Sequence, residues 1–366
     1  MTSFAGKMLC IDLTTGASET RQIPEAVYEA VLAGKGLEAW YLYKHIPVGA
    51  DPLGPENILA FAAGALCGSG SFLTGRWTVA CKSPLTGGWG DANCGGLFAP
   101  AIKQCGYDAI FISGVSKKPV YLFCDGRKAE IRDAAPYWGL DATEAENALH
   151  RDLDPVSKKK PCVACIGQAG EKLSLISGIC NEGGRIAARS GVGAVMGSKK
   201  LKAVVLAGAR PLPCHDPEKV KALSKELGEK LLKMTLPTGL GVFIGAGGCY
   251  YGQMMGVHMW KLVEYLNAAE GWHCDGDHYM EIGERIQTLR QLFNIRQGYD
   301  PAAVKLPERM LGVPPLPHGP LKGITLKNRE QVSAHWRAFG WDGESGVPLP
   351  DTVRRLGIDS LTEVSP

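Results

Sequence analysis

The sequence predicts an α+β protein, with a sheet-rich domain over residues 1–210 and a shorter, mainly helical region over 211–366 that ends in an extended tail. Three observations predict this fold. Short apolar runs alternate with turns through the first part, and few helical patterns lie among them. Prolines at 211 and 213 then interrupt the chain, and apolar residues recur at helical spacing beyond them. Prolines gather again after residue 299, which favours an extended surface segment.

The N-terminal domain is expected to begin with a β-hairpin, because residues 7–13 and 18–23 flank the turn Thr14-Thr15-Gly16. Two short helices follow at 25–33 and 37–43, separated by a glycine-containing break. The remaining apolar runs predict strands at 58–62, 78–82, 108–114, 120–124, 128–132, 163–166 and 202–206, and helices at 97–105, 143–153 and near Gly191.

The C-terminal region is expected to open with a helix that reaches about Met234. Asp216 is a good N-cap and Pro217 suits the first helical position. A glycine-rich segment at 239–256 comes next in the chain. Further helices are predicted at 260–268, 279–293 and 332–339, the last of them within the proline-rich tail.

Composition and charge exclude several classes of function. The 366 residues correspond to about two domains, and 45% hydrophobic with 21% charged residues is typical of a globular chain. A net charge of +3 gives no strong field for nucleic acid or an anionic membrane. The longest apolar stretch, residues 58–67, is too short to cross a bilayer, and the N-terminal residues lack signal-peptide order. A cytoplasmic protein is therefore expected.

The first candidate site is a glycine-rich run over residues 75–96. Closely spaced glycines let the backbone approach a bulky ligand, and Arg76 and Lys82 can donate charge-assisted hydrogen bonds to phosphate oxygens. If a helix begins near Leu97, residues 93–96 lie at its N-terminus, where phosphate is favoured. The alternative is a glycine-rich turn that packs a strand on a helix, and spacing alone does not separate the two.

The second candidate is the run over 181–197, where Arg185 and Arg189 lie four residues apart among small residues. Two arginines in this pattern suggest recognition of an anion or a ring edge. The alternative is close helix packing through Ala and Gly, with both arginines solvated. Neither glycine run matches a phosphate loop or a dinucleotide fingerprint after a strand, so a simple nucleotide site is not expected.

Twelve cysteines in a chain without an export signal favour free thiols or metal ligands over disulfides. Cys162 and Cys165 have C-x-x-C spacing, but the second falls in a predicted strand, which disfavours a metal or redox role. Cys249, in a glycine-rich loop, is more open to ligation. The lone His258 and His273 are expected to be structural or solvated.

Several long runs in order along residues 1–210 resemble one family. They are GKMLCIDLTTG (6–16), DPLGPEN (51–57), GRWTVACKSPLTG (75–87), CGYDAIFISG (105–114), IGQAGE (166–171) and RSGVGAVMGSKKLKAV (189–204). Together they resemble the aldehyde:ferredoxin oxidoreductases, and residues 263–272, 282–298 and 316–323 resemble the C-terminal end of that family.

The resemblance implies a tungsten bis-pterin (tungstopterin) cofactor, seated on the sheet-rich N-terminal domain, and one [4Fe–4S] cluster. By the same resemblance, Cys249 stands where the isolated fourth cluster ligand is expected. The cofactor contacts that the resemblance carries over fall at Arg76, Asn93, Gly95, Arg185, Ile186, Ala188, Arg189 and Tyr250.

The chain departs from the family pattern in its middle. A central helical region, with the three clustered cysteines and much of the substrate cavity, is missing between about Met234 and Gly239. Ile244 stands where the family places an aspartate that holds a pterin. With Cys249 alone from the expected set, a [4Fe–4S] cluster is under-ligated, and no catalytic acid–base residue can be named.

Three hypotheses follow from the resemblance and its departures. The chain is an oxidoreductase that converts a small aldehyde to a carboxylate and passes electrons to ferredoxin or an iron–sulfur subunit. Alternatively, it is a catalytically silent cofactor-binding or scaffold subunit that pairs with a full-length family member. In the third, it is a deletion product that folds but binds nothing. Without the central helical region, which would cover the sheet-rich N-terminal domain, an apolar surface of that domain is expected to be exposed. Such a surface predicts a homodimer or a hetero-complex.

Overall fold

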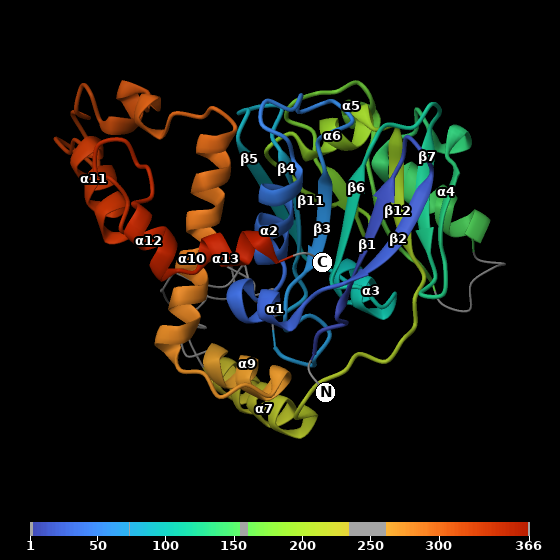
Figure 1. The fold of residues 1–366 in the computed structure, drawn as a ribbon. Helices are drawn as coiled ribbons and strands as arrows, with labels where there is room; N and C mark the ends of the chain where they lie inside the picture. Colours follow the sequence, from blue (N-terminus) through green and yellow to red (C-terminus); the bar gives the residue numbers. More distant parts are fainter. Residues whose placement is uncertain (1–2, 73, 154–159, 234–260, 365–366) are drawn as a thin grey trace.

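The computed structural model describes residues 3–72, 74–153, 160–233 and 261–364 (Figure 1). Its N-terminal part holds two six-stranded sheets, and helices from both halves of the chain cover them. This arrangement confirms the α+β fold. Cys249, Tyr250, Ile244, His258 and the glycine-rich segment at 239–256 lie outside the described residues.

The first sheet has the strand order β2-β1-β6-β3-β4-β5. The expected hairpin forms its beginning, with β1 and β2 antiparallel, and β1 pairs in parallel with β6. The strands are β1 (Lys7–Asp12), β2 (Ala17–Gln22), β3 (Leu59–Ala63), β4 (Trp77–Lys82), β5 (Trp89–Cys94) and β6 (Ala109–Ser113).

Strand β5 is not among the predicted strands, because the sequence analysis considers this glycine-rich run only as a ligand-binding segment or a packing turn. Its polar residues Asp91 and Asn93 hide the apolar alternation that marks a strand. Gly90 is needed here because a Cβ at this position would lie 2.7 Å from the Ser83 Cβ and 2.9 Å from the Ser190 Cβ. The glycine therefore serves close packing of the strand.

The second sheet has the order β11-β10-β9-β12-β7-β8. The short strands β10 and β11 are also absent from the sequence prediction, since three residues are too few to show a period. The strands are β7 (Val120–Cys124), β8 (Ala129–Asp133), β9 (Cys162–Cys165), β10 (Ile179–Asn181), β11 (Arg185–Ala187) and β12 (Leu201–Leu206).

A hydrophobic core joins the two sheets through helices α3 (Phe98–Gln104) and α6 (Val192–Ser198). Trp77, Phe61 and Phe98 are fully buried in it, with ring centroids 4.9–6.1 Å apart. Helix α4 (Ala142–Leu153) packs its apolar side on the outer face of the second sheet. The four-residue α5 (Gln168–Glu171) contacts α6.

The other face of the first sheet is covered by helices from both ends of the sequence, and together they form one buried cluster (Figure 1). Burial in this shared cluster gives the C-terminal helices their stability against the sheet. The helices are α1 (Glu25–Val31), α2 (Lys35–His45), α7 (Pro217–Lys233), α9 (Leu262–Glu270) and α10 (Gly276–Arg296).

The tail is largely exposed over residues 304–326, and helices follow it. Its last helix returns to the body, where Trp40 Nε1 of α2 donates to the Leu361 carbonyl at 3.2 Å. The elements are the 3-10 turns η3 (Pro301–Ala303) and η4 (Glu308–Leu311), and helices α11 (Asn328–Ala338), α12 (Pro350–Arg355) and α13 (Ile358–Glu363).

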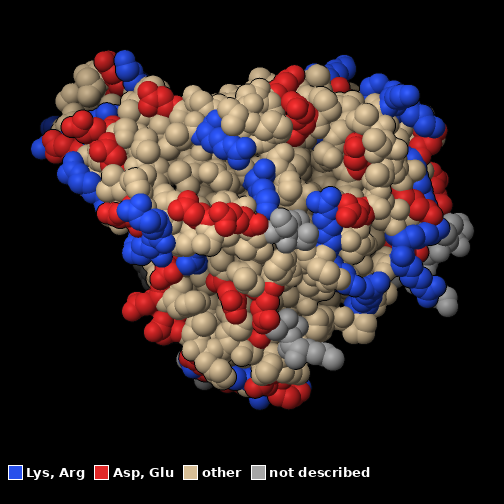
Figure 2. Space-filling view, in the orientation of Figure 1, with Lys and Arg blue, Asp and Glu red and all other residues tan. Residues whose placement is uncertain are grey.

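Charges of both signs are interspersed over the face of the molecule shown in Figure 2. Broad areas without charge lie between them. Within the described ranges, no helix combines the length and the apolar character that a bilayer crossing requires.

A buried polar network ties the N-terminal segment to α9. The Ser3 N–H donates to Glu270 Oε2 at 3.0 Å, and the Ser3 hydroxyl bonds to Glu270 Oε1. Lys103 Nζ donates to the Ser3 carbonyl at 3.1 Å and lies 3.9 Å from an Asp108 carboxylate oxygen. Burial raises the pKa of Glu270 to about 7, although Lys103 and the Ser3 bonds act against it.

Glu270→Gln is expected to flatten the pH dependence of stability between about pH 5 and 8. Because the folded-state pKa lies above the unfolded value of 4.5, the folded protein binds the extra proton, and wild-type stability falls as pH rises toward 7. Between these two pKa values, the free energy of unfolding of the wild type is expected to fall by at most about 3 kcal/mol. Urea unfolding at several pH values measures this change. It compares wild type with Glu270→Gln and with the control Glu264→Gln, which lies on the same helix. Parallel curves for wild type and Glu270→Gln contradict the expectation.

Candidate functional site

The candidate residues of the N-terminal domain gather where the two sheets meet. Asn93 is the last but one residue of β5, an edge strand of the first sheet. Arg185 begins β11, an edge strand of the second, and these two strands contact each other. Arg76 immediately precedes β4. The fold thus brings Arg185 close to residues that lie 92 and 109 positions before it in the sequence.

Arg76 and Asn93 form the first part of the site. Arg76 Nε donates to Asn93 Oδ1 at 2.9 Å. Thr78 of β4 is paired with Asn93 in the antiparallel register, so Arg76, two residues before Thr78, lies on the same sheet face as Asn93. The bond fixes the guanidinium at the end of the strand pair.

Gly95 lies between two guanidinium groups. A Cβ built on Gly95 would lie 3.5 Å from Arg76 Nη1 and 3.7 Å from Arg185 Nη1. Gly95 is partly exposed, and its own φ is not in the left-handed region. Two guanidinium groups therefore meet beside the Gly95 backbone, and paired positive charges make this a suitable place for an anion.

The β10–β11 hairpin is held against this loop by a fully buried asparagine. Asn181 Nδ2 donates to the Gly95 carbonyl at 3.2 Å, and its Oδ1 accepts from the Cys94 thiol at 3.1 Å. Glu182 next to it accepts from the Leu97 N–H. The Leu97 N–H, directly before α3, is thus already bonded to a carboxylate.

The exposed end of the hairpin carries the remaining predicted residues, Ile186, Ala188 and Arg189. Arg189 has φ +147° and Ser190 φ +58°, which L-residues adopt only when their surroundings hold them there. Ser190 Oγ donates to the Asp91 carbonyl at 3.1 Å, and the Ser190 carbonyl accepts from Ser83 Oγ at 2.9 Å. These bonds hold the strained backbone next to β5.

A network of ion pairs that sequence analysis misses ties β5 to the helices α2 and α10. Asp91 Oδ2 lies 2.6 Å from Lys35 Nζ, and Asp91 Oδ1 lies 3.0 Å from Arg290 Nη2. Trp89 Nε1 donates to the same Oδ1 at 2.7 Å. Burial by itself raises the pKa of Asp91, but Lys35 and Arg290 outweigh it and hold that pKa below its usual value. Beside them, burial holds the pKa of Glu38 well above its usual value.

The C-x-x-C pair is unsuited to chelation. Cys162 and Cys165 lie three residues apart on β9, so their side chains leave opposite faces of the strand. Burial raises the pKa of Cys165 to about 12, and its thiol donates to the Ala142 carbonyl at 3.1 Å. Over the described ranges, no three His, Cys, Asp or Glu side chains are grouped to hold a metal ion. The lone His273 is exposed.

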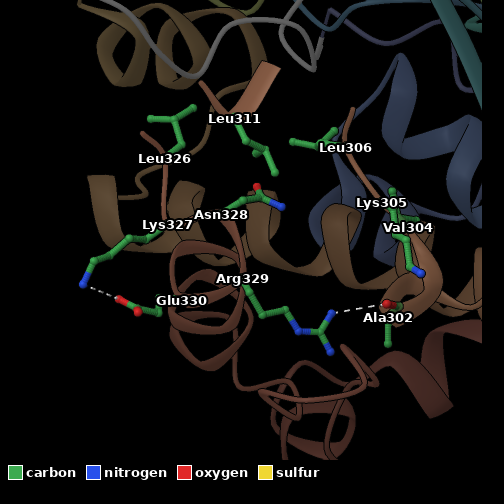
Figure 3. A pocket seen from close by; sticks show the side chains of 10 residues that line it. All are labelled: Ala302, Val304, Lys305, Leu306, Leu311, Leu326, Lys327, Asn328, Arg329 and Glu330. Carbon is green, nitrogen blue, oxygen red and sulfur yellow. Dashed lines mark hydrogen bonds and ion pairs between the residues drawn. The ribbon is translucent and has the colours of Figure 1, made fainter. Parts of the chain in front are cut away.

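A cavity of about 650 Å³ lies in the tail, and none of the candidate residues that the structure describes lines it (Figure 3). Leu306, Leu311 and Leu326 line it together with the base of α11. Arg329 spans one side and donates to the Ala302 carbonyl at 3.2 Å. Its lining residues come from the tail and from α11, so this cavity is separate from the site at β5 and β11.

Two family models match the chain. The model described as aldehyde ferredoxin oxidoreductase, N-terminal domain, matches residues 8–208. The model described as aldehyde ferredoxin oxidoreductase, domains 2 & 3, matches residues 192–358. Together they extend over most of the sequence.

Individual proteins match over a shorter part. A tungsten-containing aldehyde ferredoxin oxidoreductase of Pyrococcus furiosus is 40% identical over 226 residues, which are 62% of this chain and 37% of that protein. The aliphatic sulfonate oxidoreductase, WOR-like subunit, of the same organism is 34% identical over 261 residues, 68% of this chain and 41% of that one. The chain thus spans about two fifths of the length of these relatives.

A solved structure shares the fold. It is the active site complex BamBC of benzoyl coenzyme A reductase with 1,5-dienoyl-CoA. One of its chains superposes with a TM-score of 0.62 at 35% sequence identity, covering 66% of this chain and 38% of that one.

Proposed function

This chain belongs to the aldehyde ferredoxin oxidoreductase family, and on that basis we propose that it holds a tungsten bis-pterin group and takes part in oxidising an aldehyde to a carboxylate. Electrons would leave through an iron–sulfur centre to ferredoxin or an iron–sulfur subunit. The observation that carries this proposal is the meeting of the Arg76 and Arg185 guanidinium groups beside Gly95. We place the boundary of the cofactor-holding domain near residue 210.

The described residues fit a pterin that bears phosphate. Arg76 and Arg185 would bind phosphate oxygens by charge-assisted hydrogen bonds. Asn93 already uses its amide oxygen for Arg76, so its amide nitrogen is the group it offers a pterin edge. When bound, the tungsten group supplies two-electron oxidation and Lewis-acid activation of a carbonyl.

An iron–sulfur cluster does not fit the described residues, since they contain no grouped set of metal ligands. Cys249 lies outside them, so we derive no electron-transfer step within this chain. This mismatch supports a second candidate function, a catalytically silent cofactor-binding or scaffold subunit that pairs with a full-length family member.

Metal and pterin analysis of anaerobically purified protein tests the proposal. Tungsten with two pterins and about four irons per chain would support an oxidoreductase that carries its own cluster. Pterin without iron would support the cofactor-binding subunit. Protein that contains neither, even when co-produced with cofactor biosynthesis, would contradict both functions and leave a family member that folds without binding.

We also propose that the chain assembles with a second copy or another subunit. Large apolar side chains are exposed around the candidate site, with Leu97 65%, Ile176 81% and Ile186 47% accessible. Apolar groups exposed together mark an interaction surface. Light scattering after size exclusion is expected to give more than the 39.1 kDa of one chain, either alone or with its partner. A monodisperse monomer that captures no family member contradicts this.

A further inference from the structure

We propose that Glu182 is a positioning residue that holds Arg185 in its ligand-binding pose beside Gly95. This inference deepens the proposed function and rests on it where pterin binding is concerned. Glu182 itself is not assigned to contact the ligand. It acts through the arginine on β11.

One carboxylate joins three parts of the site. Glu182 Oε1 accepts from the Leu97 N–H and lies 3.4 Å from Asn181 Nδ2, while Oε2 lies 3.4 Å from Arg185 Nε. Leu97 belongs to the loop that carries Gly95, and Arg185 belongs to the hairpin on the other sheet. The carboxylate therefore connects the loop that carries Gly95 to the hairpin that carries Arg185.

Arg185 needs such a restraint because its side chain is 58% exposed. A long exposed side chain populates many rotamers, and fixing it on ligand binding costs conformational entropy. The ion pair with Glu182, whose side chain is 30% exposed, restricts the guanidinium while the site is empty. Arg76 has a different restraint, its bond to Asn93.

The backbone around Glu182 is arranged to place this carboxylate. Glu182, Gly183 and Gly184 have φ values of +48°, +68° and +132°, so the turn leaves β10 in the left-handed region. The Gly183 N–H donates at 2.8 Å to Glu146 Oε2, which comes from α4 and is buried. A Cβ on Gly96 would lie 2.6 Å from the Glu182 carboxyl carbon, so glycine there leaves room for the group.

Two roles of the Glu182 carboxylate, repelling an anionic ligand or positioning Arg185, predict opposite effects of Glu182→Gln on ligand binding. If the carboxylate only repels an anionic ligand, Glu182→Gln strengthens binding, because the site becomes more positive. If it positions Arg185, Glu182→Gln weakens binding, because the amide keeps an acceptor for the Leu97 N–H but no charge for the guanidinium. Glu182→Asp keeps the charge at a shorter reach and should restore part of the effect.

The test measures pterin per chain in protein purified from cells that make the cofactor, and the exchange rate of the Arg185 Nε–H by ¹⁵N NMR, assigned with Arg185→Lys. Glu182→Gln is expected to lower pterin content about threefold to fivefold and to speed Nε–H exchange by a similar factor. Glu182→Asp is expected to stay within about twofold of wild type in both.

Glu130→Gln is the matched control, because Glu130 Oε2 accepts from Arg132 Nε at 2.9 Å on the distant strand β8. It should speed exchange at Arg132 and leave the pterin content unchanged. Circular dichroism and amide exchange of the hairpin establish that each variant is folded.

Pterin content equal to or above wild type in folded Glu182→Gln, or unchanged exchange at Arg185, overturns the inference. Equal losses in Glu182→Gln and Glu182→Asp also overturn it. If wild type contains no pterin, the proposed function fails, while the exchange rate at Arg185 in the cofactor-free protein still decides whether Glu182 restrains it.

Discussion

Arg185→Ala and Arg76→Ala are each expected to lower pterin content about tenfold or more while the domain stays folded. Each substitution removes charge-assisted hydrogen bonds to phosphate, and such bonds contribute about 1.5–3 kcal/mol apiece. Arg185 is mostly exposed, so its loss changes the free energy of unfolding little. Arg76→Ala also removes the 2.9 Å bond to Asn93 and is expected to cost about 1 kcal/mol of stability.

Pterin released from purified protein and quantified per chain measures this effect, with urea unfolding as the measure of folding. Arg151→Ala, at an exposed position of α4, is the control for a lost positive charge. Arg189→Ala tests whether the exposed end of the hairpin belongs to the same site, and we expect its pterin content to fall as well. Unchanged content in both Arg76→Ala and Arg185→Ala would remove the site assignment.

Asp91→Ala is expected to lower the free energy of unfolding by about 3 kcal/mol or more at pH 7, the largest effect on stability that we predict. The substitution leaves Lys35 and Arg290, which are 11% and 24% exposed, without their shared carboxylate. An unpaired charge in a poorly solvated position is costly. Lys35 belongs to α2 and Arg290 to α10, so the change also loosens both helices from β5.

The pH dependence of this effect follows from the lowered pKa of Asp91. A carboxyl with a depressed folded-state pKa stabilises the protein above its usual pKa of 3.8, and that contribution is lost as pH falls through the folded value. Urea unfolding curves of wild type and Asp91→Ala should therefore converge only at strongly acid pH. Asp359→Ala, on the exposed side of α13, is the control. A loss below about 1 kcal/mol at pH 7 would show that the network contributes little.

Long apolar patterns were enough to locate most elements of the fold. The hairpin at the N-terminus, the strands β3, β4, β6, β7, β8, β9 and β12, and the helices α1–α4, α6, α7 and α9–α11 lie where periodicity and turn residues predict them. These signals are local, because a strand or helix with one buried face repeats its apolar residues at a fixed spacing. Strands β5, β10 and β11 lack that spacing, since they are polar or only three residues long.

The sequence by itself determined the α+β fold, the family and the two runs in which Arg76 and Arg185 lie. Only the tertiary structure decided that these arginines meet beside Gly95, because Arg76 precedes β4 of the first sheet and Arg185 begins β11 of the second. It also decided the roles of Asp91 and Glu182. Asp91 meets a partner 199 positions away, and Glu182 meets the Leu97 N–H 85 positions away. Contacts between polar groups distant in sequence leave no local period, because they depend on how whole sheets and helices pack.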